Sequence, residues 1–181
     1  MAAFRPLTSA PSSAEYLKAA LSAPVYEAAV VTPLQEMAKI SQRLENTILV
    51  KREDRQPVHS FKLRGAYNMI AGLTPEQKAK GVVTASAGNH AQGVALSANR
   101  MGRKSINCDA YCNGGYQSGC RTPVLVVKHC CMGLTLMKQK QKPLLWQKRW
   151  DIPLWPPFDH PAVIAGQATL AMELLQQRRP S

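Results

Sequence analysis

Two short segments of the sequence carry residue types that could do chemistry. The first covers residues 60–66, where Lys62 lies between apolar residues and follows Ser60, a plausible helix N-cap. The positive end of a helix and apolar neighbours both favour the neutral form of a lysine amine. A neutral amine can attack a carbonyl group and form a Schiff base. A surface lysine on an amphipathic helix is the alternative, and the segment taken alone favours it.

The second segment covers residues 84–93 and has the pattern of a strand, a turn of small residues and a helix start. Such a turn presents backbone N–H groups beside a helix N-terminus, which suits a carboxylate or a phosphate. Gly88 allows close approach of a ligand, and Asn89 offers both a donor and an acceptor. A βα turn that binds nothing fits the pattern equally well, although ligands do bind at the carboxyl ends of parallel strands.

The elements that must position both segments alternate over the first hundred residues. The patterns predict helices at 13–21, 34–44, 61–71, 75–80 and 90–101, and strands at 47–51 and 82–85. Ser13 is the expected cap of the first helix, and residues 25–27 and 32–34 are expected to be extended. Short strands and helices in alternation predict an α/β fold, with a parallel sheet flanked by helices.

The composition excludes some classes of protein and divides the chain unevenly. Its 181 residues are 45 % hydrophobic and 19 % charged, which excludes a disordered chain. The sequence shows neither an apolar run long enough for a membrane span nor a signal pattern, so we expect a cytoplasmic protein. Residues 103–150 hold nine Lys or Arg and one acid, and they therefore carry eight of the twelve net positive charges. The same stretch holds all five cysteines.

Two stretches together resemble a specific enzyme family. The sequences KREDRQPVHSFKLRGAYNMIAGL, at residues 51–73, and ASAGNHAQGVA, at residues 85–95, are similar to the biosynthetic threonine dehydratases (threonine deaminases). These are pyridoxal-phosphate enzymes of the tryptophan synthase β type, with fold type II. The resemblance runs from about residue 10 to residue 102 and resumes over residues 156–177. It implies conversion of L-threonine to 2-oxobutanoate and ammonia, the first step of isoleucine biosynthesis, by a homotetramer.

The resemblance also implies roles for individual residues. Lys62 would form the internal aldimine with pyridoxal phosphate, and Asn89 would hydrogen-bond the ring hydroxyl of this cofactor. Ser86, Ala87, Gly88 and Asn89 would cradle the substrate carboxylate. We expect no metal ligand, no nucleic acid and no membrane partner. Serine dehydratases share both patterns, so L-serine is a second candidate substrate, although the long match before Lys62 favours L-threonine.

The resemblance is lost between residues 106 and 155, for which three interpretations are open. A zinc site could use Cys108, Cys112, Cys120, His129, Cys130 and Cys131, but the spacing is poor and contains no CxxC pair. A basic nucleic-acid arm could use residues 138–149, but few aromatic residues accompany the charges. The third interpretation is that reading frames were shifted, because back-translation in shifted frames gives family-like sequence here and at residues 178–181. Four single-base insertions would then explain why this part of the chain holds all the cysteines and tryptophans and almost no Asp or Glu.

The frameshift hypothesis predicts a division of the chain. Residues 1–105 would be the N-terminal part of the catalytic domain, 106–155 a frameshifted segment, 156–177 a family-like helix and 178–181 a frameshifted tail. The C-terminal catalytic half and the regulatory domains would be absent, and we expect the chain to be inactive for that reason. We expect no regular structure in the frameshifted segment and an unburied apolar face on the helix at 163–175. A non-enzymatic basic or zinc-binding protein is the alternative function.

Overall fold

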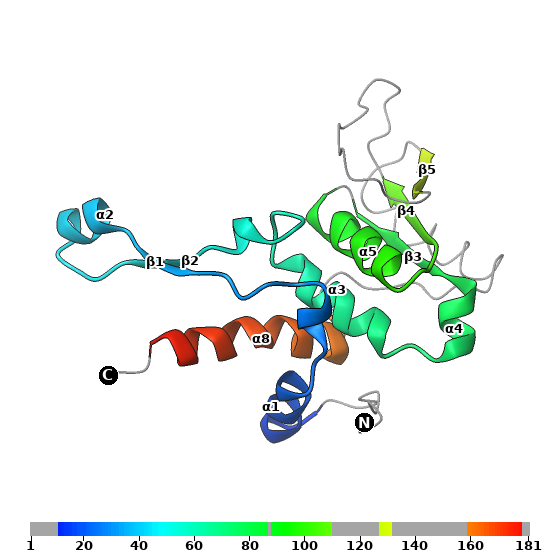
Figure 1. The fold of residues 1–181 in the computed structure, drawn as a ribbon, viewed down its shortest axis with the longest axis horizontal. Coiled ribbons are helices and arrows are strands. Elements are labelled where there is room, and N and C mark those ends of the chain that lie inside the picture. The colour runs from blue at the N-terminus through cyan, green and yellow to red at the C-terminus, as the bar shows by residue number, and fades with distance from the viewer. Residues whose placement is uncertain (1–10, 87, 110–126, 132–158, 179–181) are drawn as a thin grey trace.

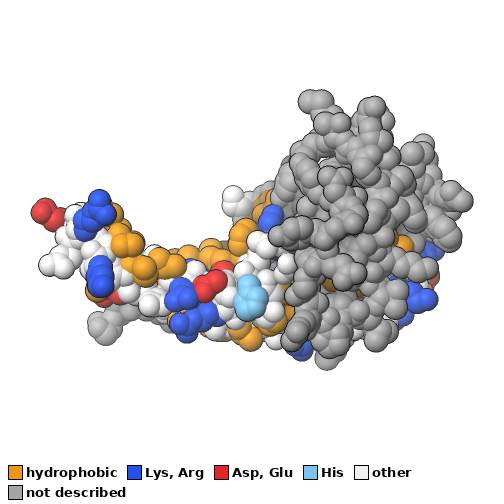
Figure 2. Space-filling view, turned by 90° about the horizontal axis from the view of Figure 1, so that it is seen from above, with side chains coloured by type: hydrophobic (Ala, Val, Ile, Leu, Met, Phe, Trp, Pro, Cys, Tyr) orange, Lys and Arg blue, Asp and Glu red, His pale blue; other side chains and the backbone are white. Residues whose placement is uncertain are grey.

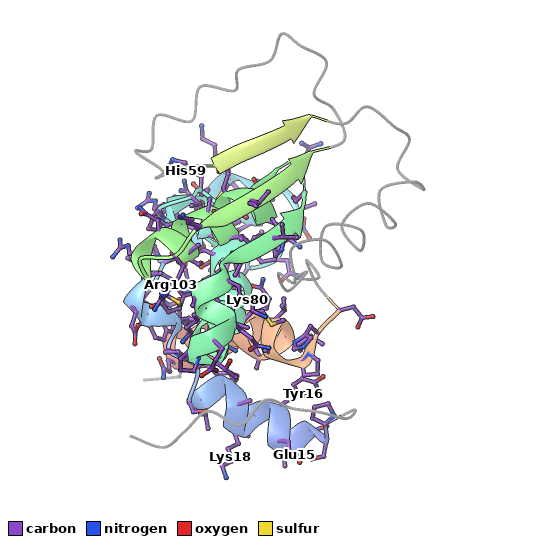
Figure 3. All side chains as sticks on the ribbon, turned by 90° about the vertical axis from the view of Figure 1, so that its right-hand side faces the viewer. Glu15, Tyr16, Lys18, His59, Lys80 and Arg103 are labelled. Atoms are coloured by element: carbon purple, nitrogen blue, oxygen red, sulfur yellow. The ribbon has the colours of Figure 1, made fainter. Side chains whose placement is uncertain are left out.

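The computed structural model describes residues 11–86, 88–109, 127–131 and 159–178 and contains a three-stranded parallel sheet, on the right-hand side of Figure 1. Strands β3 (Val82–Ala85), β4 (Ser105–Asp109) and β5 (Val127–Cys131) are hydrogen-bonded in that order, and both pairs are parallel (Figure 1 and Figure 3). The predicted α/β class, with a parallel sheet and helices beside it, is confirmed.

Helices α3 (Lys62–Ala71) and α5 (Asn89–Arg100) pack against each other and against strand β3. The apolar residues at this meeting point are buried and form one cluster, which consists of Ala66, Ile70, Leu73, Val82, Val94 and Ala98. Helix α4 (Pro75–Lys80) connects α3 to the sheet and begins at the predicted residue, because Thr74 and Gln77 form a capping box there. This core fixes both segments that the sequence marks for chemistry.

The N-terminal elements differ in detail from the sequence expectation. Helix α1 (Ser13–Leu21) has its expected bounds, but Ser12 rather than Ser13 is its N-cap. Ser12 forms a capping box with Glu15, which lies three residues after it. An N-cap at Ser13 would have Tyr16 at that position and could not form this pair. The segment Val25–Glu27 is a short 3₁₀ helix, η1, and not extended.

A two-stranded arm replaces the start of the helix predicted at 34–44. Strand β1 (Leu34–Glu36) pairs with β2 (Leu49–Lys51) in an antiparallel register, and helix α2 (Ala38–Arg43) follows β1. The helical prediction is wrong for the first residues because strand pairing with a distant segment satisfies their backbone groups. We call these three elements the β1–α2–β2 arm, and the arm projects from the body of the molecule (Figure 1).

The C-terminal helix α8 (Pro161–Gln177) packs along α3 and α1. Its buried residues include Val163, at 2 % exposure, so the expectation of an unburied apolar face is wrong for the side that meets α3. Ile164 and Leu175 do remain exposed. Close packing is possible because glycines meet at the crossing: a Cβ on Gly166 would lie 2.8 Å from Cα of Gly65.

Part of the segment at residues 106–155 is regular. Most of β4 and all of β5 fall in it, so the expectation of no regular structure is wrong for residues 106–109 and 127–131. Parallel pairing uses backbone groups, which even a sequence without strand periodicity can supply. The other residues of this segment, and residues 179–181, lie outside the described part of the chain. Within the described ranges, no helix is long and apolar enough to cross a membrane.

Candidate active site

Lys62 is the first residue of α3, one residue after the predicted start. Its backbone N–H donates to the Ser60 hydroxyl oxygen at 3.3 Å, so Ser60 contacts the helix start although Phe61 occupies the N-cap position. The Lys62 side chain is half-buried, and its Nζ lies 5.5 Å from the centre of the Phe61 ring, within cation–π range. The structure therefore places the Lys62 amine at a helix N-terminus beside an aromatic ring.

The second segment forms the predicted turn between β3 and α5. Strand β3 ends at Ala85, Gly88 occupies the N-cap position and α5 begins at Asn89, one residue before the predicted start. The Gly88 N–H donates to Ser86 Oγ at 3.3 Å. Asn89 is exposed, and a Cβ on Gly88 would meet no described residue within 4 Å. Ala87, the remaining residue of the predicted substrate cradle, lies outside the described residues.

Helix α5 brings the two segments together. A Cβ on Gly93 would lie 3.2 Å from the carbonyl oxygen of Lys62 and 3.2 Å from the backbone nitrogen of Leu63. Contacts this short are tighter than those a Cβ ordinarily makes, so a side chain at position 93 would push the starts of the two helices apart. The part of α5 around Gly93, about one turn after Asn89, therefore lies against the first turn of α3, which begins with Lys62.

His90 is a third polar residue in this region, and the sequence analysis did not single it out. Its side chain is buried, with 5 % of the residue exposed. Burial lowers the pKa of His90 to about 4, with a further contribution from the positive charge of Lys62. The imidazole is therefore neutral near pH 7. A histidine after Asn89 in a helix start gives no sequence signal that separates a buried ring from an exposed one.

A buried group of charged residues holds α3 in place, and we call it the Arg64 cluster. Arg64, with no exposed side-chain surface, donates from Nε and Nη2 to the two carboxylate oxygens of Glu53, at 2.8 Å each. Its Nη1 donates to Glu173 Oε1 at 2.6 Å, and Lys51 Nζ donates to Glu173 Oε2 at 2.5 Å. Glu53 lies in the 3₁₀ helix η2 (Glu53–Arg55), Lys51 in β2 and Glu173 in α8, so with α3 the cluster ties four elements together.

The charges in the Arg64 cluster are stabilised by one another. Burial by itself would raise the pKa of Glu53 and Glu173, but hydrogen bonds from Arg64 outweigh it and the pKa of both carboxyls is lowered. Further bonds to Glu53 come from Thr32 and Gln56. The network fixes the residue two positions after Lys62. The sequence shows that Arg64 lies among apolar residues, but it does not reveal that the partner is Glu173.

The zinc and basic-arm interpretations concern side chains that the structure does not describe. Within the residues that it does describe, no group of three or more His, Cys, Asp or Glu could hold a metal ion. The suggested ligand set is not tested, because Cys112 and Cys120 lie outside the described residues and the other four side chains are not described, and the basic stretch at 138–149 lies outside them as well.

The residues present fit pyridoxal phosphate, which needs an amine and anion-binding groups around an open space. Lys62 supplies the amine, and the N-terminal N–H groups of α5, which lack partners within the helix, suit the carboxylate of an amino acid beside the cofactor. Among the described residues, none lies in front of Gly88 and none is a hydrogen-bond partner for the buried Nε2 atom of His90. Lys62 and Asn89 are the residues that would hold the cofactor.

The parallel sheet with α3 and α5 beside it defines an α/β domain, in which Lys62 and the turn before α5 form the candidate site. The family model described as pyridoxal-phosphate dependent enzyme matches residues 25–115, half of the chain, and the chain belongs to this family. The match ends inside the segment that begins at residue 106.

Similar proteins agree with the resemblance predicted from the sequence. The chain is 57 % identical to the biosynthetic L-threonine dehydratase IlvA of Salmonella typhimurium, over 98 % of this chain and 34 % of that protein. It is 46 % identical to the chloroplastic threonine dehydratase 1 of Solanum lycopersicum, over 90 % of this chain and 27 % of that protein. The resemblance to biosynthetic threonine dehydratases is therefore confirmed. The chain spans about a third of the length of these relatives.

Solved structures agree with both the fold and the family. The processed form of threonine deaminase isoform 2 from Solanum lycopersicum matches 96 % of this chain with a TM-score of 0.81 and 37 % identity, over 48 % of its own length. The serine racemase of maize matches 91 % of this chain with a TM-score of 0.77 and 25 % identity, over 49 % of its own length. The parallel sheet and the helices beside it are therefore those of a fold-type-II enzyme.

Proposed function

We propose that this chain contributes the lysine-bearing part of a threonine ammonia-lyase, which converts L-threonine to 2-oxobutanoate and ammonia. The observation that carries the proposal is the close contact between Gly93 and Lys62, because it joins the lysine to the turn that starts at Ser86. Identity of 57 % to a protein named biosynthetic L-threonine dehydratase supports the choice of reaction. The reaction would be the first step of isoleucine synthesis, in the cytoplasm.

Lys62 and Asn89 would hold the cofactor in this proposal. When bound, pyridoxal phosphate supplies a carbonyl carbon for the lysine amine and a ring that accepts electrons from the substrate α-carbon. Lys62 Nζ is the natural base for the α-proton, because it is the amine at this site and α3 holds it in place. Asn89, exposed at the start of α5, would bind the ring hydroxyl of the cofactor.

The turn from residue 86 to Asn89 would bind the substrate carboxylate. The N-terminal N–H groups of a helix attract an anion, and the backbone at Gly88 is open to one. The reaction needs no added oxidant or reductant, since the substrate loses its hydroxyl as water, regains a water and releases its nitrogen as ammonia. L-Serine has the same hydroxyl and amine, so it is the competing substrate to test.

A homotetramer is the assembly that we propose together with this function. Its support is the family resemblance and the exposure of large apolar side chains on the β1–α2–β2 arm (Figure 2). Ile40 is 42 % exposed and Leu44 is 59 % exposed, and both lie on or beside α2. Contact between subunits would cover such side chains.

Covalent labelling tests the proposed function on the chain as it is. The purified chain is incubated with pyridoxal phosphate, reduced with borohydride, digested and analysed by mass spectrometry. We expect the label on Lys62 at a level at least about tenfold above the exposed Lys18, which corresponds to about 1.4 kcal/mol. Lys18 lies on α1, away from the parallel sheet, and serves as the internal reference (Figure 3).

Two variants and a substrate complete this test. Lys62→Ala should abolish the site-specific label, whereas Lys18→Ala should leave labelling at Lys62 unchanged. L-Threonine should lower the label at Lys62 more than L-serine does if threonine is the substrate. Labelling spread evenly over the exposed lysines would contradict the proposed function, and stronger competition by L-serine would contradict the choice of substrate.

A further inference from the structure

The buried imidazole of His90 has an unsatisfied atom. The residue is 5 % exposed, and its Nε2 has no hydrogen-bond partner among the residues that the structure describes. Buried polar side-chain atoms in folded proteins nearly always have a partner, and each exception needs an explanation. In the described part of the chain, three other buried side-chain atoms share this property, on Asn68, Thr84 and Gln167.

His90 lies in a different part of the fold from two of those three residues, Asn68 and Gln167. Asn68 and Gln167 lie where α3 crosses α8, and Asn68 already donates through Nδ2 to the carbonyl of Ala162 at 2.7 Å. His90 and Thr84 instead lie on opposite sides of the β3–α5 turn, the turn proposed to bind the substrate. Unsatisfied atoms at that turn are explained if a ligand completes them.

The helix geometry directs His90 towards Lys62. Residues three apart share one face of a helix, so His90 lies on the face of α5 that carries Gly93. Gly93 is in close contact with the backbone of Lys62 and Leu63, and the next two residues on this face, Val94 and Ser97, are buried as well. His90 is about one turn closer to the start of the helix than Gly93, on the same face, and the charge of Lys62 acts on its ring.

Electrostatics agree with this placement. The charge of Lys62 acts on the His90 ring strongly enough to add to the effect of burial on the pKa of His90. The ring therefore adds no second positive charge next to the lysine near pH 7. A neutral imidazole has one donor and one acceptor nitrogen, so Nε2 can form one hydrogen bond whichever tautomer is present.

We propose that His90 is a ligand-binding side chain of this site, whose Nε2 hydrogen-bonds an oxygen atom of the pyridoxal phosphate held at Lys62. The inference rests on the proposed function, because it needs the cofactor at Lys62. It adds a buried side chain to the exposed Asn89 at the start of the same helix. A buried hydrogen bond is worth more to binding than an exposed one, since losing it leaves an atom unpaired away from water.

Labelling and NMR spectroscopy of the purified chain test this role. Four proteins are compared: the unmodified chain, His90→Leu, His90→Gln and His59→Gln. Leucine keeps the bulk without a hydrogen bond, and glutamine keeps a neutral hydrogen-bonding group. His59 is an exposed histidine whose Nδ1 lies 2.9 Å from the carbonyl oxygen of Asp54, so His59→Gln is the matched control (Figure 3).

The concentration of pyridoxal phosphate that half-labels Lys62 should rise about tenfold in His90→Leu, the loss expected for one buried hydrogen bond. It should stay within about threefold in His90→Gln, and it should not change in His59→Gln. In the unmodified chain, the ¹⁵N resonance of His90 Nε2 should shift when pyridoxal phosphate is added. That last measurement needs no variant, so a folding defect in His90→Leu cannot hide the answer.

Two results overturn the inference. The first is that Lys62 becomes labelled while the ¹⁵N resonance of His90 Nε2 does not shift. The second is that His90→Leu needs the same concentration of pyridoxal phosphate to half-label Lys62 as the unmodified chain does. Either would leave the proposed function standing. Failure of Lys62 to take up the label in the unmodified chain would overturn the proposed function and the role of His90 with it.

Discussion

Arg64 has no exposed side-chain surface, and its two carboxylate partners come from different elements. Removing one member of a buried ion pair leaves an uncompensated charge away from water, which typically costs about 3 kcal/mol or more. Glu173→Gln should therefore lower the free energy of unfolding by about 3 kcal/mol, measured by urea denaturation.

A matched control uses the exposed ion pair between Arg52 and Asp54, whose atoms are 2.7 Å apart. Asp54→Asn should leave the stability close to that of the unmodified chain, because water screens exposed pairs. If Asp54→Asn and Glu173→Gln lowered the free energy of unfolding equally, the buried Arg64 cluster would contribute no more to stability than an exposed ion pair.

The same cluster predicts how stability depends on pH. The pKa of Glu173 is lowered in the folded chain: burial alone would raise it, but hydrogen bonds from Arg64 and Lys51 outweigh this. A carboxyl with a lowered folded pKa stabilises the fold above its ordinary value, 4.5, and this contribution is lost as the pH falls through the folded pKa. Stability should fall below about pH 4.5, and less steeply in Glu173→Gln than in the unmodified chain. Parallel pH profiles of the two proteins would contradict this.

Sequence reasoning found the residues of the site more easily than the residues that support them. Lys62 and Asn89 belong to contiguous motifs, so their neighbours in the chain identify them. The pair between Arg64 and Glu173 joins residues 109 positions apart, and no local pattern identifies such a partner. His90 was missed for a related reason, because burial depends on packing against α3.

Among the elements, the crossing of α3 and α8 depends on two glycines. A Cβ on Gly166 would lie 2.6 Å from the carbonyl oxygen of Arg64 and 2.8 Å from Cα of Gly65. Gly166→Ala should therefore force the helices apart and lower the free energy of unfolding by about 1–3 kcal/mol, the usual cost of overpacking. Thermal unfolding followed by circular dichroism measures this loss.

Ala171→Ser is the control for this substitution. It adds one heavy atom to an exposed position on the same helix, so we expect little change in the unfolding temperature. A Gly166→Ala variant as stable as the unmodified chain would mean that α8 can move away from α3 without loss of packing.

Element boundaries followed the sequence where local interactions set them. The capping box of Thr74 and Gln77 starts α4 where the sequence predicts. The helix predicted at 34–44 was wrong at its start because residues 34–36 pair with residues 49–51 across the arm. Local pattern cannot weigh such pairing against helix formation.

At the scale of the whole molecule, the frameshift hypothesis remains a prediction about the gene. Backbone pairing places β4 and β5 in the sheet, but it does not depend on which side chains they carry. We predict that the nucleotide sequence contains an extra base near each of codons 106, 123, 155 and 178. Sequencing the locus checks this prediction. It would be contradicted if the shifted reading frames of the gene did not encode sequence similar to the family at these places.

The distance along the chain between the two sides of the Arg64 cluster has a consequence for protein synthesis. Glu173 follows Arg64 by 109 residues, so at ribosomal speeds it is made roughly 5–20 s later. During that interval the Arg64 guanidinium of the newly made α3 lacks the Glu173 carboxylate. The apolar residues of α3 that α8 covers in the folded chain are also uncovered. A chaperone that binds emerging apolar segments would find its target in this window, and release would follow once α8 leaves the ribosome.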